Sequence, residues 1–202
     1  MNEVVVVDLG MGNLRSVARA LERAGGRVTV SSDPDVVGAA PRLVVPGQGH
    51  FADCARAMDG AMGETCRAHI ASGRPYLGLC LGMQILFDES EEAPGARGLG
   101  VFAGRVVRFA DDTILADGTR RKIPHMGWNA VEGARFEDDW FYFVHSFHCV
   151  PNDPSIVIGV SEYGERVCAA VARDNVMACQ FHPEKSSAAG ARVLERFLAG
   201  AS

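Results

Sequence analysis

Two features that the sequence lacks exclude whole classes of protein: a long hydrophobic run and a pair of closely spaced cysteines. No stretch approaches the roughly 20 apolar residues that a membrane-spanning helix needs, so we expect no membrane segment. The six cysteines are scattered and form no C-x-x-C pair. In a chain this long, that pattern argues against a disulfide framework and against a zinc site, and we expect no bound metal.

Positive charge is also in short supply. The chain has 20 lysines and arginines against 25 aspartates and glutamates, a formal net charge of −5, which gives no electrostatic reason to bind nucleic acid or an anionic membrane. The one basic run, at residues 120–122, is too short to change that conclusion and is typical of a solvated strand end. The N-terminus carries Glu3 where a signal peptide needs positive charge, and we therefore expect a cytoplasmic protein.

What the sequence does have is the size and composition of one ordinary globular domain. Its 202 residues suffice for a substantial core without disulfides or metals. Hydrophobic residues make up 48% of the chain and charged residues 22%, both usual values for a globular protein in water. No internal repeat, low-complexity stretch or linker interrupts it, so we predict a single domain over residues 1–202.

The first half alternates short apolar runs with helical patterns. We expect strands at residues 4–7, 27–30, 43–45 and 75–79, and helices at residues 14–24, 51–70 and 81–87. Gly60 and Gly63 are predicted to interrupt the second helical region. Such alternation is typical of a parallel sheet that helices cover on both faces.

The second half, after Pro94, changes character. We expect short strands at residues 98–109, 119–123, 140–144, 156–160, 167–172 and 176–180, and a final amphipathic helix at residues 187–198. Strands that follow one another with only turns between them favour a mixed or antiparallel extension of the first sheet. The predicted fold is therefore α/β, with a mostly parallel central sheet flanked by helices and an antiparallel extension.

Cys80 lies at the junction of a predicted strand and a predicted helix, in the sequence GLCLG of residues 78–82. The flanking glycines let the backbone turn sharply and let neighbouring elements approach, as in a nucleophile elbow. The start of a helix also favours thiolate over thiol, because the helix dipole is positive there. The alternative is an inert buried cysteine between chance glycines, and with 23 glycines in the chain only the other motifs decide.

A cysteine nucleophile needs a base, and the base needs a group that orients it. His182 and Glu184 offer both, because residues two apart in an extended segment project to the same side and Pro183 disfavours a helix. Taken alone, His182 is typical of a hydrogen-bonded strand end and Glu184 of a solvated helix start. Their occurrence together with Cys80 reverses that weighting, and we predict a Cys80–His182–Glu184 triad.

Acyl transfer also requires N–H donors for the oxyanion. One is predicted to be the backbone N–H of Leu81, directly after the nucleophile. Gly47 and Gly49, at the end of another predicted strand, are a second source, since glycines let a peptide group turn its N–H toward a ligand. On its own, an ordinary strand-end turn would be the better interpretation of these two glycines.

Together these motifs resemble the class I glutamine amidotransferases. The resemblance rests first on GLCLGMQ at residues 78–84 and FHPEKS at residues 181–186. Three further segments narrow it to one branch: DLGMGNL at residues 8–14, IPHMGWN at residues 123–129 and FVHSF at residues 143–147. That branch comprises the glutaminase subunits of imidazole glycerol phosphate synthases, in L-histidine biosynthesis. The resemblance covers the chain from end to end and implies a flavodoxin-like fold.

The resemblance implies a specific reaction and site. Members of the family hydrolyse L-glutamine to glutamate and ammonia through a γ-glutamyl thioester, here on Cys80, without a cofactor. His182 would act as base and then as acid, and Glu184 would orient it. Gln84 and Glu92 would hold the amino-acid end of glutamine. Backbone groups near three further residues would complete the pocket: Gly49, Ser146 and Phe147.

The resemblance also implies a protein partner. Ammonia would pass to a cyclase subunit, a (β/α)8 barrel that forms a heterodimer with the glutaminase and makes imidazole glycerol phosphate and an aminoimidazole carboxamide ribotide. Asn13, Met126 and Trp128 would lie toward that partner, core packing being the alternative for Met126 and Trp128. Such subunits are nearly inactive alone, and we expect the peptides between Gly47 and Gly49 to turn productively only with the partner present.

Two departures from the family pattern stand out, and three alternatives stay open. Leu9 replaces the usual tyrosine, and Gln48 and His50 alter the glycine loop. The alternatives are a glutaminase subunit of the anthranilate or pyridoxal phosphate synthase type, a stand-alone cysteine hydrolase or peptidase, and a non-catalytic regulatory subunit. Residues 124–129 speak against the first alternative, Gln84 against the second, and the intact triad against the third.

Overall fold

The computed structural model describes residues 2–115, 118–137 and 139–200. A mixed ten-stranded sheet forms its centre, with the strands in this order: β2 (Arg27–Ser31), β1 (Glu3–Val7), β3 (Leu43–Gly47), β4 (Tyr76–Cys80), β12 (Val176–Cys179), β11 (Arg166–Arg173), β9 (Phe147–Pro151), β6 (Gly104–Arg108) and β5 (Glu89–Ser90), with β10 (Val157–Glu162) paired to β11. A separate antiparallel ribbon consists of β7 (His125–Ala130) and β8 (Trp140–His145).

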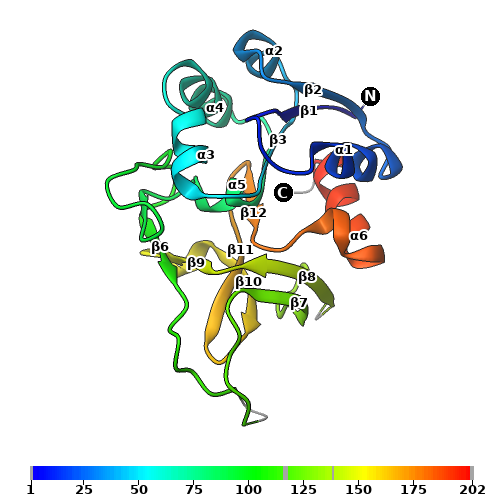
Figure 1. Ribbon diagram of the computed structural model, residues 1–202. Coiled ribbons are helices and arrows are strands. Elements are labelled where there is room, and N and C mark those ends of the chain that lie inside the picture. The colour runs from blue at the N-terminus through cyan, green and yellow to red at the C-terminus, as the bar shows by residue number, and fades with distance from the viewer. Residues whose placement is uncertain (1, 116–117, 138, 201–202) are drawn as a thin grey trace.

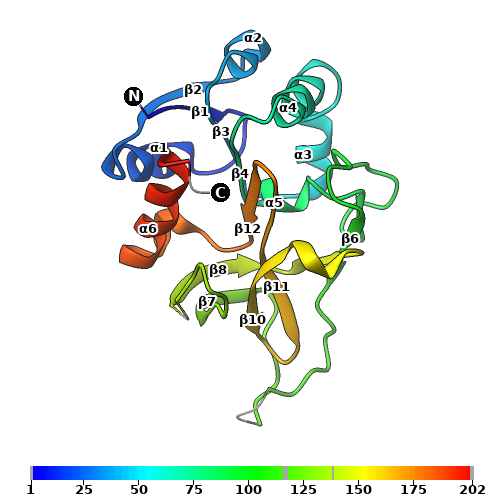
Figure 2. The same cartoon turned by 180° about the vertical axis from the view of Figure 1, so that it is seen from behind.

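Helices cover both faces of the parallel strands. They are α1 (Leu14–Arg23), α2 (Pro34–Gly38), α3 (Phe51–Ala57), α4 (Ala61–Ala71), α5 (Leu81–Gln84) and α6 (Ser187–Leu198), with short 3-10 turns η1 (Pro154–Ile156) and η2 (Pro183–Lys185). Helices α1 and α6 lie on one side of the sheet and α3 and α4 on the other, as both views show (Figures 1 and 2). Among the described residues, none of the helices is both long and apolar enough to cross a membrane.

The five strands from β2 to β12 run parallel, which confirms the expectation from the first half of the sequence. Successive residues of β1 point to opposite faces of the sheet. Val5 and Val7 join the core under α2, α3 and α4, whereas Val4 and Val6 join the core under α1 and α6. Because both faces are buried, the strand is a continuous apolar run rather than an alternating one.

Beyond β12 the sheet continues antiparallel through β11, β9 and β6, and β5 alone pairs parallel to β6 at the edge. This confirms the predicted antiparallel extension, although its strands differ in detail. Strands β7 and β9 were not expected, and of residues 98–109 only Gly104–Arg108 form a strand. The predicted helix at residues 81–87 is shorter, Leu81–Gln84. Of the two glycines predicted to interrupt the helical region, Gly60 lies between α3 and α4, whereas Gly63 lies inside α4.

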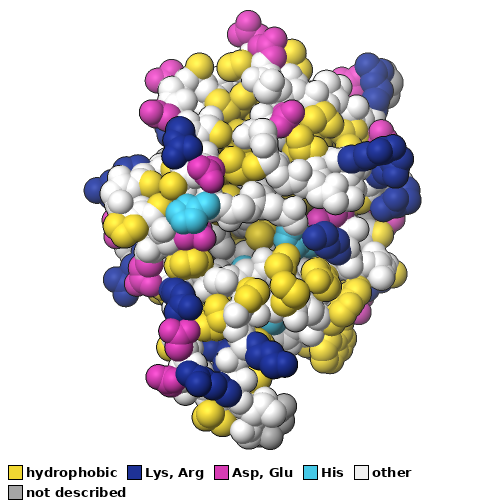
Figure 3. All heavy atoms as spheres, viewed as in Figure 1, with side chains coloured by type: hydrophobic (Ala, Val, Ile, Leu, Met, Phe, Trp, Pro, Cys, Tyr) yellow, Lys and Arg dark blue, Asp and Glu magenta, His cyan; other side chains and the backbone are white. Residues whose placement is uncertain are grey.

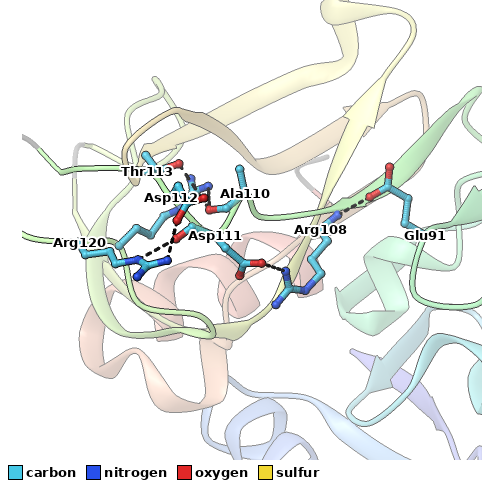
Figure 4. A network of polar contacts seen from close by, with 8 residues as sticks. Glu91, Arg108, Ala110, Asp111, Asp112, Thr113 and Arg120 are labelled. Atoms are coloured by element: carbon cyan, nitrogen blue, oxygen red, sulfur yellow. Dashed lines mark hydrogen bonds and ion pairs between the residues drawn. The ribbon is translucent and has the colours of Figure 1, made fainter.

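The prediction of a strand at residues 119–123 was wrong. Only an isolated bridge between Ile114 and Arg120 forms there. Arg120 instead donates to the Asp111 carbonyl and to the Asp112 carboxylate, and Arg108 pairs with the Asp111 carboxylate (Figure 4). Charge pairs and loop hydrogen bonds therefore shape the segment between β6 and β7, which extends away from the body of the molecule (Figure 1).

Arg121 is buried, which corrects the interpretation of residues 120–122 as a solvated strand end. Its guanidinium donates to the carbonyls of Ala110 and Tyr163, at 2.7 and 3.0 Å, and to the Glu165 carboxylate at 2.6 Å. It also lies over the Phe109 ring, 4.8 Å from the centroid. Burial of a guanidinium is costly unless most of its donors are paired, and these contacts tie the loop after β6 to the turn between β10 and β11.

We predict that Arg121→Ala lowers the free energy of unfolding by about 2–4 kcal/mol, because it removes three hydrogen bonds of a buried side chain together with its packing against the Phe109 ring. Arg120→Ala is the matched control: its side chain and that of Asp112 are both exposed, so the change should stay within about 0.5 kcal/mol. Urea denaturation of both variants beside the parent chain measures the two effects. Equal midpoints for the two variants would contradict the prediction.

Candidate active site

The carboxyl ends of three neighbouring parallel strands lie side by side and bring the predicted catalytic segments to one place. Strand β4 lies between β3 and β12, and Gly47 at the end of β3 pairs in register with Cys80 at the end of β4. The chain leaving β12 reaches His182 after two residues. Sites in open α/β sheets form at such carboxyl ends of strands, where the connecting loops meet.

Cys80 has a strained backbone, with φ of 55° and ψ of −108°, a conformation that residues other than glycine rarely adopt. Its neighbours make the turn possible. A Cβ on Gly82 would lie 1.8 Å from the Val45 carbonyl oxygen, and one on Gly78 would lie 2.4 Å from the Gly82 carbonyl oxygen. The glycines are therefore required for α5 to approach β3 and β4. This requirement favours the interpretation as a nucleophile elbow over that of an inert cysteine between chance glycines.

His182 and Glu184 lie side by side as their spacing predicts. Nδ1 of His182 is 2.8 Å from the Glu184 carboxylate, and both side chains are almost fully buried. Ser186 fixes the segment, since its hydroxyl donates to the His182 carbonyl at 2.6 Å and accepts from the Tyr142 N–H. The other imidazole nitrogen, Nε2, makes no hydrogen bond among the described residues.

The pKa of His182 is raised to about 9. Burial by itself would lower it, but the adjacent Cys80 sulfur and the Glu184 carboxylate outweigh burial and favour the imidazolium. Burial instead raises the pKa of the other five cysteines, to about 12 for Cys54, and keeps them as unreactive thiols.

A cavity of about 330 Å³ opens directly beside Cys80. Most of the predicted oxyanion and substrate residues line it: Gly49, Leu81, Gln84, Glu92, Ser146 and Phe147. Gly47 does not; it packs so closely on Leu81 that a Cβ would lie 2.7 Å from that side chain. A cavity of this volume suits a ligand the size of an amino acid, with Cys80 at its wall.

Gln84 and Glu92 are already engaged within the chain. The Gln84 amide nitrogen donates to the Phe147 carbonyl at 3.2 Å and to the Gln180 side-chain oxygen at 3.0 Å, which uses both of its protons. Its side-chain oxygen is left as an acceptor. Glu92 accepts the N–H of Phe51 at 2.8 Å, at the first turn of α3. Two acceptors in one cavity suit a cationic group such as an α-ammonium.

Two residues near the site were not predicted. The Gln180 amide lies 3.5 Å from the Cys80 sulfur, although nothing in the sequence pointed to it except its position just before residues 181–186. His50 caps α3, since its Nδ1 accepts the Ala52 N–H at 3.1 Å. The departure from the family pattern at His50 therefore has a local structural role beside the glycine loop.

The predicted interface residues on β7 are exposed rather than packed in the core. Met126 is 61% exposed and Trp128 49%. Cross-strand pairing puts both on the same face as the residues opposite them on β8, Val144 and Tyr142, and Trp140 lies further along that face. We call this face, Met126, Trp128, Ala130, Trp140, Tyr142 and Val144, the outer face of the ribbon. Hydrophobic side chains gather there on the surface (Figure 3).

Asn13 lies at the start of α1, away from the ribbon in sequence but close to the triad. Its side chain accepts the Ser16 N–H at 3.2 Å and so caps the helix. It also lines a second cavity of about 10 Å³, together with His182 and Glu184, which is room for one water-sized molecule. Asn13 is thus exposed on one side and adjoins the triad on the other.

Within residues 2–115, 118–137 and 139–200, there is no cluster of three or more histidine, cysteine, aspartate or glutamate side chains that could hold an ion. The residues described above include a cysteine at an elbow, a histidine paired with a carboxylate, and a backbone N–H at the start of a helix, groups that suit covalent acyl transfer.

Comparison with known proteins points to one family. The glutamine amidotransferase class-I family matches residues 5–201. The imidazole glycerol phosphate synthase subunit HisH of Syntrophotalea carbinolica is 48% identical, over 96% of this chain and 98% of the relative. The subunit of the same name from Aromatoleum aromaticum is 48% identical over the whole of both chains, and that from Methanothermobacter thermautotrophicus is 42% identical over 96% and 97%.

Solved structures agree on the fold. One described as a crystal structure of glutamine amidotransferase has a TM-score of 0.74 at 21% identity and covers 98% of both chains. A chain in the structure of PurLQS from Thermotoga maritima has a TM-score of 0.73 at 18% identity, over 98% of this chain and 97% of that one. At such identities the likeness shows the architecture alone.

Proposed function

The chain belongs to the class-I glutamine amidotransferase family, and on that premise we propose that it is the glutaminase subunit of an imidazole glycerol phosphate synthase in histidine biosynthesis. The observation that carries the proposal is the cavity beside Cys80. It combines a nucleophile on an elbow and acceptors for an amino acid, and it adjoins an exposed apolar ribbon. We expect the reaction in the cytoplasm, in keeping with the six free thiols.

Glutamine is proposed to bind with its amino-acid end away from Cys80. The Gln84 oxygen and the Glu92 carboxylate would accept from the α-ammonium, since both are acceptors in the cavity wall. The backbone of Ser146 and Phe147 lies at the same wall and would meet the α-carboxylate. This placement directs the γ-carboxamide toward the sulfur of Cys80 and the N–H of Leu81.

The first half of the reaction is acylation of Cys80. With the proton of the Cys80–His182 pair on Nε2 of His182, the sulfur attacks the γ-carbonyl carbon, whose oxygen becomes an oxyanion near the Leu81 N–H. His182 then returns the proton to the leaving nitrogen, the carbon–nitrogen bond breaks, and ammonia departs from a γ-glutamyl thioester. Glu184 stabilises the imidazolium between these two transfers and holds the imidazole in position.

The second half is hydrolysis of the thioester. A water molecule takes the place of ammonia, His182 accepts its proton, and the resulting hydroxide attacks the thioester carbon. The carbon–sulfur bond breaks, the sulfur regains its proton from His182, and glutamate leaves. The sum is glutamine plus water giving glutamate plus ammonia, with Cys80 and His182 restored.

The released ammonia is proposed to reach a cyclase barrel subunit docked on this chain. Ammonia in water becomes protonated and is then no longer a nucleophile, so its use by an acceptor requires a covered route. The outer face of the ribbon is suited to docking, because it is apolar, exposed and continuous with the cavity through Val144. Gly49, with a φ of 112°, and the rest of its loop lie at the same cavity and would respond to docking.

The raised pKa of His182 predicts how turnover depends on pH. Because that pKa is about 9 rather than its ordinary 6.5, the imidazolium that protonates the leaving nitrogen persists through neutral pH. We expect kcat to be flat from pH 7 to 8 and to fall about tenfold per pH unit above 9. Glu184→Gln removes a charge that favours the imidazolium, so the fall should begin at lower pH. An alkaline limb that does not move in this variant would contradict the assignment.

The test of the proposed function is glutamate release from L-glutamine by the purified chain, alone and with a cyclase barrel subunit and its ribonucleotide substrate. We expect weak release alone and strong stimulation by the partner with its substrate. Full activity without any response to the partner would assign the chain to a stand-alone hydrolase. No activity in any mixture would contradict the glutaminase role itself.

A further inference from the structure

A continuous path of hydrogen bonds connects strand β7 to the catalytic cysteine. We call it the relay, and its members are Asn129, His125, His145, the Phe147 carbonyl, Gln84, Gln180 and Cys80. Of this set, the mechanism described above uses Gln84, Cys80 and the backbone of Phe147, and leaves both histidines without a role. The two histidines stand apart from the triad and are both buried.

The steps of the relay on the β7 side are short. Nδ2 of Asn129 lies 3.2 Å from Nε2 of His125, and Nδ1 of His125 lies 2.9 Å from Nε2 of His145. Nδ1 of His145 lies 2.8 Å from the Phe147 carbonyl oxygen. Each ring nitrogen of both histidines therefore has one partner, so no polar atom of the pair is left unpaired.

The chemistry of the partners determines where every proton lies. The Phe147 carbonyl can only accept, so Nδ1 of His145 carries a proton and donates. A neutral imidazole carries one proton, so Nε2 of His145 accepts, and Nδ1 of His125 is its donor. Nε2 of His125 then accepts from the Asn129 amide. Donation runs in one direction, from β7 toward the substrate cavity.

The surroundings keep both histidines neutral, as this arrangement requires. Burial lowers the pKa of His125 to about 4, and burial with the neighbouring histidines lowers that of His145 to about 3. The His125 ring is stacked between Phe143 and Tyr163, with centroids 4.7 and 3.9 Å away. Aromatic contacts on both faces leave the ring little freedom to turn, so the direction of donation is fixed.

The Phe147 carbonyl is the point where the relay reaches the substrate cavity. It accepts from His145 on one side and from the Gln84 amide on the other, which occupies both of its lone pairs. Gln84 in turn donates to Gln180, and the Gln180 amide lies against the Cys80 sulfur. Loss of the His145 contact would let the carbonyl move, and the Gln84 side chain would then lose the partner that fixes its orientation.

Strand β7 presents the relay on one face and the apolar docking residues on the other. Side chains alternate along a strand, so Met126 and Trp128 point outward while His125 and Asn129 point inward. A partner that grips the outer face would therefore shift the strand that carries the first two members of the relay. One strand thus adjoins both the proposed interface and the polar path to the cysteine.

We propose that His145 is a positioning residue of the glutaminase, which holds the Phe147 carbonyl and Gln84 in place for glutamine and connects them to the partner-facing strand β7. The proposal rests on the proposed function and adds a residue through which the partner acts on glutamine binding. His145 does not touch the reacting atoms, so its effect is exerted through Gln84 and the cavity wall.

Two substitutions at His145 separate its two contacts. In His145→Asn, the side-chain amide nitrogen stands near the place of Nδ1, so donation to the Phe147 carbonyl is kept and the contact with His125 is lost. In His145→Gln, the longer side chain reaches toward His125 but gives up the Phe147 carbonyl. His145→Leu removes both contacts. The same substitutions at His148, a buried histidine that stacks on Phe109 outside the relay, are the matched controls.

The measurements are KM and kcat for glutamine, with and without the barrel subunit, and glutamine affinity by calorimetry in a Cys80→Ala background. We expect His145→Leu and His145→Gln to raise KM and Kd about 5- to 10-fold with a smaller change in kcat. His145→Asn should recover most of that affinity and yet lose about tenfold in stimulation by the partner. The His148 variants should change neither quantity by more than about twofold.

Spectroscopy gives a readout that does not depend on turnover. In the chain labelled with ¹⁵N-histidine, we expect His145 to be neutral with its proton on Nδ1 between pH 5 and 8. A protonated His145, or a proton on Nε2, would overturn the proposal. Equal KM, Kd and stimulation for the Asn, Gln and Leu variants and the parent chain would overturn it as well. Absence of glutamate release by the parent chain would instead count against the proposed function.

Discussion

Replacing Cys80 by alanine is expected to reduce glutamate release by about 10⁴-fold or more, both in the isolated chain and with the partner present. The thioester cannot form without the sulfur, and Cys80 is the one cysteine among the described residues that line the cavity. The fold should persist, because the variant removes one atom from a side chain that is only 7% exposed. Glutamate release and a thermal melt of the same preparation measure both expectations.

The matched control is Cys54→Ala. Cys54 lies on the buried face of α3 and burial raises the pKa of its thiol to about 12, so it should have no part in the reaction. An electrophilic glutamine analogue should label Cys80 alone in the parent chain, and glutamine should slow the labelling. Retention of a few per cent of activity in the Cys80 variant, or labelling of another cysteine, would contradict the assignment.

Replacing Trp128 by alanine is expected to weaken binding of the barrel subunit by about 30- to 1000-fold. Tryptophans at the centre of an interface commonly contribute about 2–4 kcal/mol to binding, and Trp128 lies in the middle of the outer face, against Tyr142. Basal glutamate release should change little, because Trp128 does not line the substrate cavity. Titration of the barrel subunit by calorimetry or by stimulated turnover measures the loss.

Val36→Ala is the matched control for a merely hydrophobic effect. Val36 is an exposed apolar side chain on α2, at the opposite end of the molecule from the ribbon (Figure 1). Val36→Ala should change the affinity for the barrel subunit by no more than about twofold relative to the parent chain. If Trp128→Ala bound the barrel subunit as tightly as the parent chain does, the outer face would not be the docking surface.

The parallel half of the fold was predictable because each of its units is local. The apolar run of β1, the helical spacing of α1 and the glycines that follow it all lie within residues 3–26. Alternation of such units leaves a parallel sheet as the arrangement that buries both faces. Part of the site was predictable for the same reason, because the elbow at Cys80 and the pair His182 and Glu184 each depend on residues only a few positions apart.

The second half was less predictable because its strands form by pairing rather than by propensity. Strand β7 includes Gly127 and Asn129, which are unfavourable in strands, yet it pairs along its whole length with β8. Residues 119–123 showed the opposite error: a strand was predicted there, but the buried Arg121 guanidinium holds the segment through hydrogen bonds to the Ala110 and Tyr163 carbonyls instead. In both cases a distant contact outweighed the local preference.

By itself, the sequence determined the α/β class, the elbow, the spacing of the histidine and its carboxylate, and the motifs that mark the family. Only the tertiary structure decided that Met126 and Trp128 are exposed, that Arg121 is buried, and that two histidines connect β7 to the cavity. The physical reason is separation along the chain. Gln84 and Gln180 are 96 positions apart, and their hydrogen bond exists only because β4 and β12 pair side by side.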